Sequence, residues 1–594
     1  MFREYYKYIL ILVAAAIVFT VLPIVDIIRS PNFSWQNPGA LIIPFSGYYL
    51  DRLNEIKDGN IFLGNPYFIE HSQEIAPAFF AADWVAYIPM FFGLSMPYAI
   101  VCNLFLWSLV FLILSFYIFN QMGIKKAMSV IGAILVYLMG YSLIITPVSM
   151  QTVYPFYLLM FLAFILWLKD PVDRIKQIFL TLALAACFYI YTYLWQIALT
   201  ACFLFLIYFF ISKRKKELII LLKILAAVFF LALPLFIYTY KQVMHPWYWE
   251  TMQRIGLVNT HWLTAEVYYS GRWVILSLIL WLTLKFLNKD LAANQRYDLL
   301  SVYFSLTGLA LVIVSASNLI TGKDLELAQH LVRFIRVWLG FSLVSFMYFI
   351  FKNFSYFKLF KINLKKQIVI WVLLLVVIYG AFGYLAKSSF SYFQERVDYS
   401  GQIDNYKQIE AALGWLEEQE REPVAVMADY RSDANRYITT LTKHYVLFSD
   451  SGVLHLLSDK EAEERYLLNG AINNLSLKDI ENDYHLFAGN GNATHPYKTY
   501  NRQVKICKIL RLDLFNYNCG QLTDAISFKG EKYFIDLFNQ YQKEIVPNIN
   551  QELKKFNVSY ILIDKEDIVN LGLLKIKNIR EVYQNKNWLI YKIL

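Results

Sequence analysis

The chain has 594 residues, of which 58% are apolar and 17% are charged. Soluble proteins average about 45–50% apolar residues, so this composition excludes an ordinary soluble enzyme. A net charge of +10 could indicate nucleic-acid binding in a soluble protein. Here the basic residues lie mostly in short connections between apolar runs, as membrane orientation requires, so we predict no nucleic-acid partner.

The apolar runs divide the chain near residue 387. Residues 1–387 hold nearly all of them, and 388–594 resemble a soluble α/β protein. Because a span needs about 20 mostly apolar residues, the first part predicts a polytopic α-helical domain of about eleven transmembrane helices. The run 175–212 is divided into two spans near Thr192. Counting it as one span would place residues 388–594 on the other side of the membrane. The predicted spans are 6–28, 97–119, 127–145, 153–168, 175–192, 194–212, 218–239, 273–288, 298–318, 334–351 and 367–386.

Basic residues concentrate in alternate connections of this part. The long first connection, 29–96, is poor in them, with Arg29, Arg52 and Lys57. The charge bias places the N-terminus inside and residues 388–594 outside, and we assign the chain to the cytoplasmic (inner) membrane. The basic connections include Lys125-Lys126, Lys169 to Lys176, Lys213 to Lys216, Lys285 to Arg296 and Lys352 to Lys366.

The first outer segment, 29–96, contains a predicted helix over 48–57 that ends at Asp58-Gly59-Asn60. Asp51, Glu55 and Asp58 lie on one face of this helix. A general base or a divalent-cation site would explain three carboxylates on one face, as would a solvated surface. Taken alone, the pattern favours the solvated surface.

Glu70-His71 follows, with Glu74 close by. A carboxylate beside an imidazole can move protons or bind a metal ion. We therefore consider His71 and Glu70 as ligands of a divalent cation, magnesium or manganese, with an ordinary surface pair as the alternative. No cofactor is demanded by the sequence.

The last outer segment leads into a span through His330, Arg333 and Arg336, spaced by three residues. Cations at the start of a span are costly unless they snorkel to the headgroups or meet an anion. The planar fork of arginine suits phosphate, and a lipid-linked phosphate would lie at this depth. Arg272, at the end of the outer segment 240–272, is grouped with them as a phosphate ligand.

The tail alternates predicted helices with short apolar strands, which is typical of an α/β layer domain. It has no glycine-rich phosphate loop and no nucleophile elbow, so we interpret it as a binding or structural module. Cys507 and Cys519 could form a disulfide if the tail lies outside. The predicted helical stretches are 404–420, 433–443, 459–473 and 531–556, and the strands are 423–428, 445–448, 558–563 and 588–593.

The chain resembles the GT-C superfamily of membrane glycosyltransferases, and more closely uncharacterised bacterial members of it. The resemblance covers nearly the whole chain with diffuse motifs. In the first outer segment these are Tyr48-Tyr49, Asp58-Gly59, Gly64 to Tyr67 and Glu70-His71. Further along they are Thr321-Gly322 with His330, Asn557 to Ile561 and Asn587 to Tyr591.

This resemblance implies transfer of a sugar from a polyprenyl-phosphate or polyprenyl-pyrophosphate donor to a glycan, lipid or protein acceptor at the outer face of the membrane. It implies Asp51 as general base, Asp58 as second choice and Glu70 in support. It also implies that His330, Arg333, Arg336 and Arg272 hold the donor phosphate.

One departure from the family pattern affects the catalytic assignment. The family usually has an aspartate just before Tyr-Tyr, where this chain has Ser46-Gly47. A non-catalytic scaffold is therefore one alternative function. A polysaccharide or lipid-carrier transporter is another, although the polar residues gather on one outer surface rather than at mid-membrane.

Overall fold

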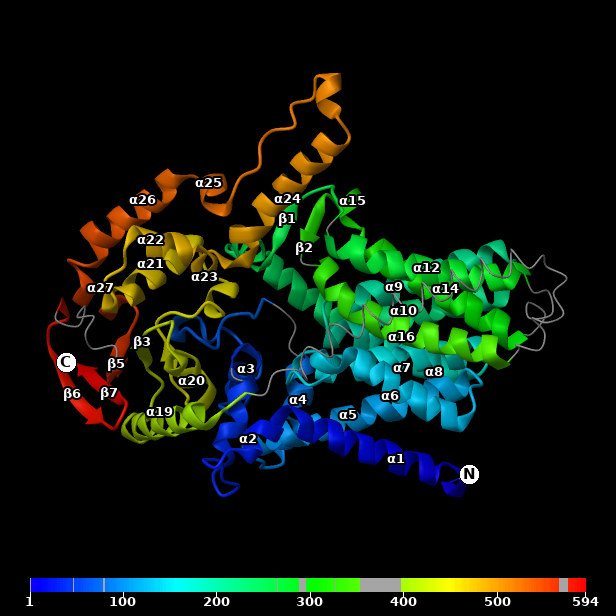
Figure 1. The fold of residues 1–594 in the computed structure, drawn as a ribbon, viewed down its shortest axis with the longest axis horizontal. Helices are drawn as coiled ribbons and strands as arrows, with labels where there is room; N and C mark the ends of the chain where they lie inside the picture. Colours follow the sequence, from blue (N-terminus) through cyan, green and yellow to red (C-terminus); the bar gives the residue numbers. More distant parts are fainter. Residues whose placement is uncertain are drawn as a thin grey trace.

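A bundle of long helices and an α/β domain occupy opposite ends of the molecule (Figure 1). The computed structural model describes residues 2–45, 47–77, 81–263, 265–287, 295–325, 327–352, 397–565 and 575–594. The N-terminal end of helix α1 lies at the end of the bundle far from the α/β domain, and the C-terminus lies in the sheet of that domain (Figure 1).

Eight helical stretches of the described chain are long and apolar enough to cross a membrane, which makes this a multi-pass membrane protein. They run over Tyr5–Arg29, Met96–Gln121, Lys126–Ile144, Met150–Lys169, Leu194–Ile211, Lys215–Val243, Asp298–Thr321 and His330–Phe349. The helices that form them are α1 (Phe2–Val21), α2 (Val25–Arg29), α5 (Met96–Gln121), α6 (Lys126–Ile144), α7 (Ser149–Lys169), α9 (Leu194–Ile211), α10 (Lys215–Val243), α14 (Gln295–Ser315), α15 (Asn318–Thr321) and α16 (Leu327–Lys352).

Two further predicted spans form shorter or partly described helices, α8 (Arg174–Ile190) and α12 (Ala265–Leu287). Helix α8 ends at Ile190 and α9 begins at Leu194, so the predicted break near Thr192 is confirmed. The eleventh predicted span, 367–386, lies outside the described residues.

The bundle buries aromatic side chains such as Trp167 and Trp338 and turns other apolar side chains outward. Phe229, Phe230 and Ile237 of α10 are exposed. Apolar side chains that would be unfavourable in water are compatible with lipid, which has no hydrophobic drive to bury them.

The first outer segment lies between the bundle and the α/β domain. It consists of η2 (Pro38–Phe45), α3 (Tyr48–Lys57), η3 (Ile69–His71) and α4 (Ala81–Phe91). Helix α3 confirms the predicted helix over 48–57, and Gly59 follows it with φ +99°, a conformation that favours glycine.

The two later outer segments are joined by a small sheet that the sequence did not predict. Helix α11 (Tyr248–Ile255) leads into β1 (Leu257–Asn259), which pairs antiparallel with β2 (Lys323–Leu325). Val258 lies opposite Asp324. The connection before α16 is thereby fixed to the one before α12.

The α/β domain has a sheet of order β4-β3-β5-β7-β6, in which β3 is parallel to β4 and β5, and β7 is antiparallel to both neighbours. The predicted α/β layer is confirmed, whereas β6 and α24 were not predicted. The strands are β3 (Ala425–Ala428), β4 (Tyr445–Val446), β5 (Val558–Asp564), β6 (Ile579–Gln584) and β7 (Trp588–Ile593). The helices are α19 (Ser400–Gln419), α20 (Asp433–Leu441), α21 (Asp459–Asn469), α22 (Leu477–Asn482), α23 (Tyr484–Phe487), α24 (Gly489–Ile509), α25 (Ala525–Lys529), α26 (Glu531–Gln540) and α27 (Ile549–Lys555).

The first outer segment is bonded to this domain. The backbone N–H of Val446, in the edge strand β4, donates to the carbonyl of Tyr67 at 2.9 Å. The Asn54 amide donates to the carbonyls of Thr439 and Thr442 at 3.1 and 2.7 Å. These buried bonds fix the position of α3 from the domain side.

Candidate functional site

The bundle end beside α3 carries a cationic cluster lined by tyrosines, formed by His330, Arg333, Tyr49, Tyr191 and Tyr193. The Tyr191 hydroxyl is hydrogen-bonded to His330 Nδ1 and lies 3.4 Å from a guanidinium nitrogen of Arg333. The Tyr193 ring stacks on His330 with centroids 4.5 Å apart. Tyr49, from α3, also hydrogen-bonds to Arg333. The first and last outer segments therefore meet at Arg333.

Arg333 of this cluster and Arg336, further along the same helix, have no carboxylate partner within the described part of the chain. The ionisable side chains that act on Arg333 most strongly are Tyr191, Tyr49 and Tyr154, and Tyr154 donates to its backbone carbonyl at 3.0 Å. Arg336, one helical turn further on, has a buried Nε with no hydrogen-bond acceptor among the described residues. Guanidinium groups without a carboxylate partner at the end of an apolar bundle favour an anionic ligand.

A buried ion pair adjoins this cluster on the side of the first outer segment. Arg52 of α3 donates to Asp83 Oδ2 at 2.6 Å, and both side chains are buried. Arg52 also donates to the Tyr48 hydroxyl at 3.0 Å. Burial raises the pKa of Asp83 although Arg52 opposes the shift. A carboxylate with a raised pKa is a better proton acceptor near neutral pH.

The sequence-based search for acids missed Asp83. It lies in the apolar stretch that leads to the next span, in the first turn of α4, and its partner is 31 positions away. The acids of α3 were singled out because they share one helix face, and Asp83 has no second acid at such a spacing in α4. A single acid within an apolar run was the only available signal.

Asp51 faces the α/β domain rather than Arg333. It is 2% exposed, and its Oδ1 accepts hydrogen bonds from the hydroxyls of Thr439, at 3.1 Å, and Thr440. Burial raises the pKa of Asp51, against the effect of these bonds and of Tyr67. Tyr49 and Asp51 are two residues apart on α3, and they therefore point to different sides of the helix.

The solvated surface favoured for the α3 acids is wrong for Asp51 and Glu55. Both are buried, because the α/β domain covers this face of the helix. Burial raises the pKa of Glu55 to about 7, and its carboxylate accepts from Asn60 at 2.6 Å. Asp58 is exposed at the C-cap position of α3, so a solvated surface describes this one acid.

Glu70 and His71 belong to an ion-pair network with α21. Glu70 lies 2.8 Å from Arg465, and His71 lies 2.9 Å from both Glu74 and Glu461. These residues do not fit a metal site, because both imidazole nitrogens face carboxylates and Glu70 faces a guanidinium. In the described ranges, no three acidic, histidine or cysteine side chains gather closely enough to hold a metal ion.

Arg272 of α12 stacks over the neighbouring Trp273 ring at 5.1 Å. The structure thus brings together His330 and Arg333, with Arg336 one turn along the same helix. It separates Asp51, Glu70 and His71 from them, on the side of the α/β domain.

The network around His71 gives a pH-dependent contact between the first outer segment and α21. The carboxylates of Glu461 and Glu74 raise the pKa of His71 to about 9, against desolvation, from an unfolded value near 6.5. The charged imidazole therefore stabilises the folded state fully below pH 6.5, and this contribution is lost as pH rises through 9.

We expect the thermal unfolding midpoint of the detergent-solubilised protein to decrease as the pH is raised from 6.5 to 9. The variant His71→Gln should remove most of this decrease. The matched control is His485→Gln, since His485 is exposed and bonds the carbonyl of Asn482, three positions earlier in the chain. An unchanged slope in His71→Gln would show that other groups cause the pH dependence.

A cavity of about 490 Å³ opens beside α3, between the first outer segment and helices α19 and α20. Thr440, which donates to Asp51, lines it together with Asn54. The other polar side chains around it come from both parts of the chain and include Asn37, Lys57, Tyr406 and Glu410. Asp51 is thus separated from this cavity by the Thr440 hydroxyl.

No family model matches the sequence, and no curated protein matches it. In three dimensions the chain is similar to the Archaeoglobus fulgidus oligosaccharyltransferase in the apo form, at 13% identity and a TM-score of 0.43, over 95% of this chain and 70% of that one. It is also similar to ArnT from Cupriavidus metallidurans in the apo state, at 11% identity and a TM-score of 0.40, over 99% of this chain and 98% of that one.

Proposed function

We propose that the protein is a membrane glycosyltransferase that takes a sugar from a polyprenyl-phosphate or polyprenyl-pyrophosphate donor. The acceptor is a glycan, a lipid or a protein, and transfer takes place on the side of the membrane that carries the α/β domain. By the charge bias of the connections this is the outer face of the cytoplasmic membrane.

The observation that carries the proposal is the pair of arginines at the bundle end without a carboxylate partner within the described residues. A lipid-linked phosphate has its charge at the depth where Arg333 and Arg336 enter the membrane, and its isoprenoid chain would lie along the apolar outer surface of the bundle. Charge-assisted hydrogen bonds from Arg333, with tyrosine hydroxyls around it, would stabilise the phosphate as it leaves the sugar.

The first outer segment supplies the carboxylate that accepts the acceptor's proton in this proposal. We assign that role to Asp83, because its partner Arg52 contacts Tyr48, and the Tyr48 ring packs against that of Tyr49, which hydrogen-bonds to Arg333. Asp51, the first candidate from the sequence, would instead hold α3 against Thr439 and Thr440. The other candidates from the sequence, Asp58, Glu70 and Arg272, have no role in the transfer step in this assignment.

Transfer of radiolabel from polyprenyl-phosphate sugars to added glycan, lipid or peptide acceptors, by the purified chain in nanodiscs, tests the function. A transferase moves label onto an acceptor. A transporter reconstituted in vesicles would move the intact donor across the bilayer, and a scaffold would do neither. Absence of transfer with every donor, together with transport of intact donor, would replace this proposal by the transporter.

The assignment of the carboxylates is tested in the same assay. We expect Asp83→Asn to lower the transfer rate per folded molecule by about 100-fold, the lower part of the usual range for general-base removal. Asp51→Asn should leave the rate within about threefold, because the amide oxygen of the new side chain can still accept from one threonine. A collapse of transfer in Asp51→Asn with Asp83→Asn fully active would return the base to Asp51.

A further inference from the structure

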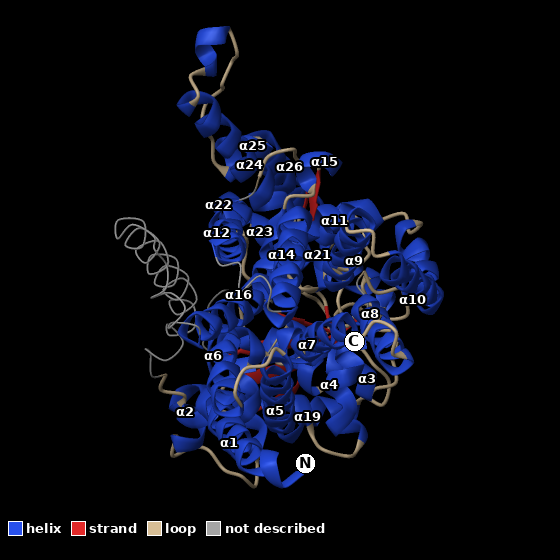
Figure 2. Cartoon of the chain, turned by 90° about the vertical axis from the view of Figure 1, so that its right-hand side faces the viewer, coloured by secondary structure: helices blue, strands red, loops and turns tan. Residues whose placement is uncertain are grey.

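Helix α24 carries a segment that projects away from both the bundle and the sheet. We call residues 505–522 the arm. Figures 1 and 2, viewed at right angles, both show it extending from the top of the molecule. It comprises the end of α24, the short helix η7 (Leu512–Phe515) and part of the loop that leads from η7 to α25.

The tip of the arm exposes large apolar side chains close together in sequence. Ile509 is 77% exposed and Phe515 is 80% exposed. Leu510, Leu514, Tyr517 and Leu522 are also exposed. Scattered exposed apolar residues are ordinary in proteins, but a contiguous group at the end of a projection marks an interaction surface.

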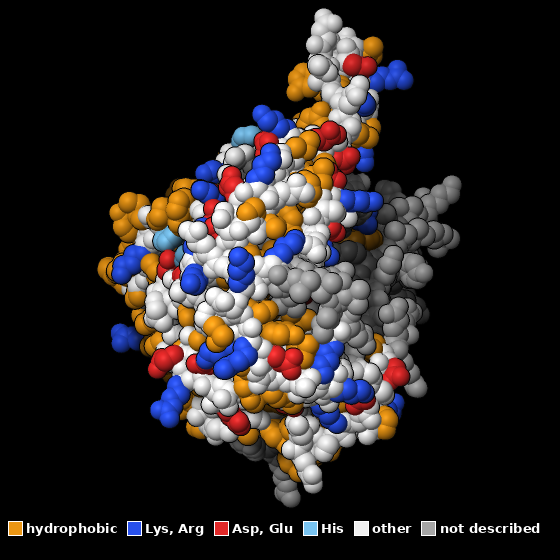
Figure 3. All heavy atoms as spheres, turned by 90° about the vertical axis from the view of Figure 1, so that its left-hand side faces the viewer, with side chains coloured by type: hydrophobic (Ala, Val, Ile, Leu, Met, Phe, Trp, Pro, Cys, Tyr) orange, Lys and Arg blue, Asp and Glu red, His pale blue; other side chains and the backbone are white. Residues whose placement is uncertain are grey.

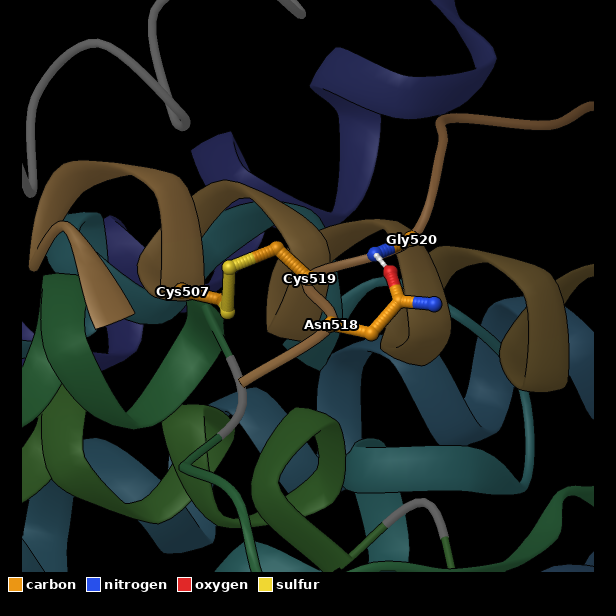
Figure 4. The surroundings of a disulfide bond; sticks show 4 residues. All are labelled: Cys507, Asn518, Cys519 and Gly520. Atoms are coloured by element: carbon orange, nitrogen blue, oxygen red, sulfur yellow. Dashed lines mark hydrogen bonds between the residues drawn. A yellow bond between two sulfur atoms is a disulfide. The ribbon is translucent and has the colours of Figure 1, made fainter. Parts of the chain in front are cut away.

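A disulfide between Cys507 and Cys519 closes the arm at its base (Figure 4). The backbone N–H of Gly520 donates to Asn518 Oδ1 at 2.9 Å beside it. A cross-link limits the conformations of a loop that has no core of its own, so the exposed apolar side chains are held in place. The pairing considered for these cysteines from the sequence is present in the structure.

Basic side chains surround the apolar tip. Lys505, Lys508 and Arg511 are exposed on the arm, and Asp513 is its single acidic residue. Figure 3 shows hydrophobic side chains beside basic ones on the arm, at the top of the view. Apolar and aromatic side chains combined with lysine and arginine are the chemistry of segments that lie in the headgroup layer of a membrane.

The position of the arm matches this chemistry. Along the bundle axis, its tip stands level with α15 and β2, which mark the end of the bundle next to the α/β domain (Figure 1). Viewed along the bundle, it reaches beyond the outline of the helices (Figure 2). A membrane around the bundle would therefore have its surface beside the arm.

We propose that the arm inserts its apolar tip into the headgroup layer of the leaflet on the side of the α/β domain, with its basic residues on anionic lipid phosphates. Insertion would bury Leu514 and Phe515 and fix the rotation of the domain over the membrane. This role is independent of whether the protein transfers sugars.

Photo-labelling of the full chain in lipid tests the proposal. The protein is placed as single copies in nanodiscs of phosphatidylcholine with phosphatidylglycerol and a trace of phospholipid bearing a photoreactive headgroup-region probe. We expect label on the peptide that spans residues 509–522. In the double variant Leu514→Asp/Phe515→Asp the amount of label on this peptide should fall at least about tenfold, since charges at both positions oppose insertion.

The matched control is Ile535→Asp, because Ile535 is an exposed apolar residue of α26 outside the arm. It should leave the label on the arm unchanged. Cys507→Ser/Cys519→Ser should lower the label, since the open loop no longer presents its tip. Two outcomes overturn the proposal: label on the spans but none on the arm, or label on the arm only in separate discs prepared with more than one copy.

Discussion

Arg333→Ala should reduce sugar transfer from a polyprenyl-phosphate donor by about 100-fold or more. Each charge-assisted hydrogen bond contributes about 1.5–3 kcal/mol, and loss of two of them corresponds to about two to four orders of magnitude in rate. Arg333 has tyrosines and no carboxylate around it within the described chain, so its charge is free to act on the donor phosphate.

Arg333→Lys separates charge from geometry. Lysine keeps the positive charge but lacks the planar fork, so we expect an intermediate loss of about tenfold. The matched control is Arg174→Ala, an exposed arginine in the first turn of α8, at the end of the bundle away from the α/β domain. Initial rates at several donor concentrations give the measurement. Equal rates in Arg333→Ala and wild type would remove Arg333 from the site.

Asp83→Leu should destabilise the protein by about 3–5 kcal/mol, the usual cost of removing one member of a buried ion pair. The reason is that Arg52 would stay charged with no carboxylate partner, since a guanidinium does not deprotonate in proteins. Arg52→Leu should cost less, because the remaining carboxyl can take up a proton, and burial already raises the pKa of Asp83.

The difference in stability between Asp83→Leu and Arg52→Leu should depend on pH. Asp83 left alone in Arg52→Leu is protonated more readily at pH 5 than at pH 8, so this variant should lose less stability at pH 5. The double variant should recover much of the loss, because two apolar side chains leave no buried charge. Thermal unfolding of the solubilised variants gives the comparison, with Arg174→Leu as control. A double variant as unstable as Asp83→Leu would contradict this explanation.

Much of the fold follows from local patterns that a sequence displays. Apolar runs long enough for lipid predicted α5, α6, α9 and α10, and buried strands such as β5 stand out because they are β-branched and continuous. The break between α8 and α9 was also predicted, near Thr192. The pairing of β1 with β2 was not, because each strand has only three residues.

The site could be predicted only in part, for a physical reason. His330, Arg333 and Arg336 share one helix, so their spacing alone shows that they act near one another. Asp51 was judged from its helix neighbours, but its environment is set by Thr439 and Thr440, which are 388 and 389 positions away. Contacts between distant segments decide burial, and a single sequence does not display them.

Retention of polyprenyl phosphate by the purified chain tests whether Arg333 holds the phosphate of a lipid-linked donor, on which the proposed function rests. Native mass spectrometry of the detergent-solubilised protein, mixed with polyprenyl phosphate, measures the bound fraction. We expect one retained lipid in wild type and in Arg174→Ala, and its loss in Arg333→Ala. Equal retention by Arg333→Ala and wild type, with both proteins folded, would show that Arg333 does not hold the phosphate.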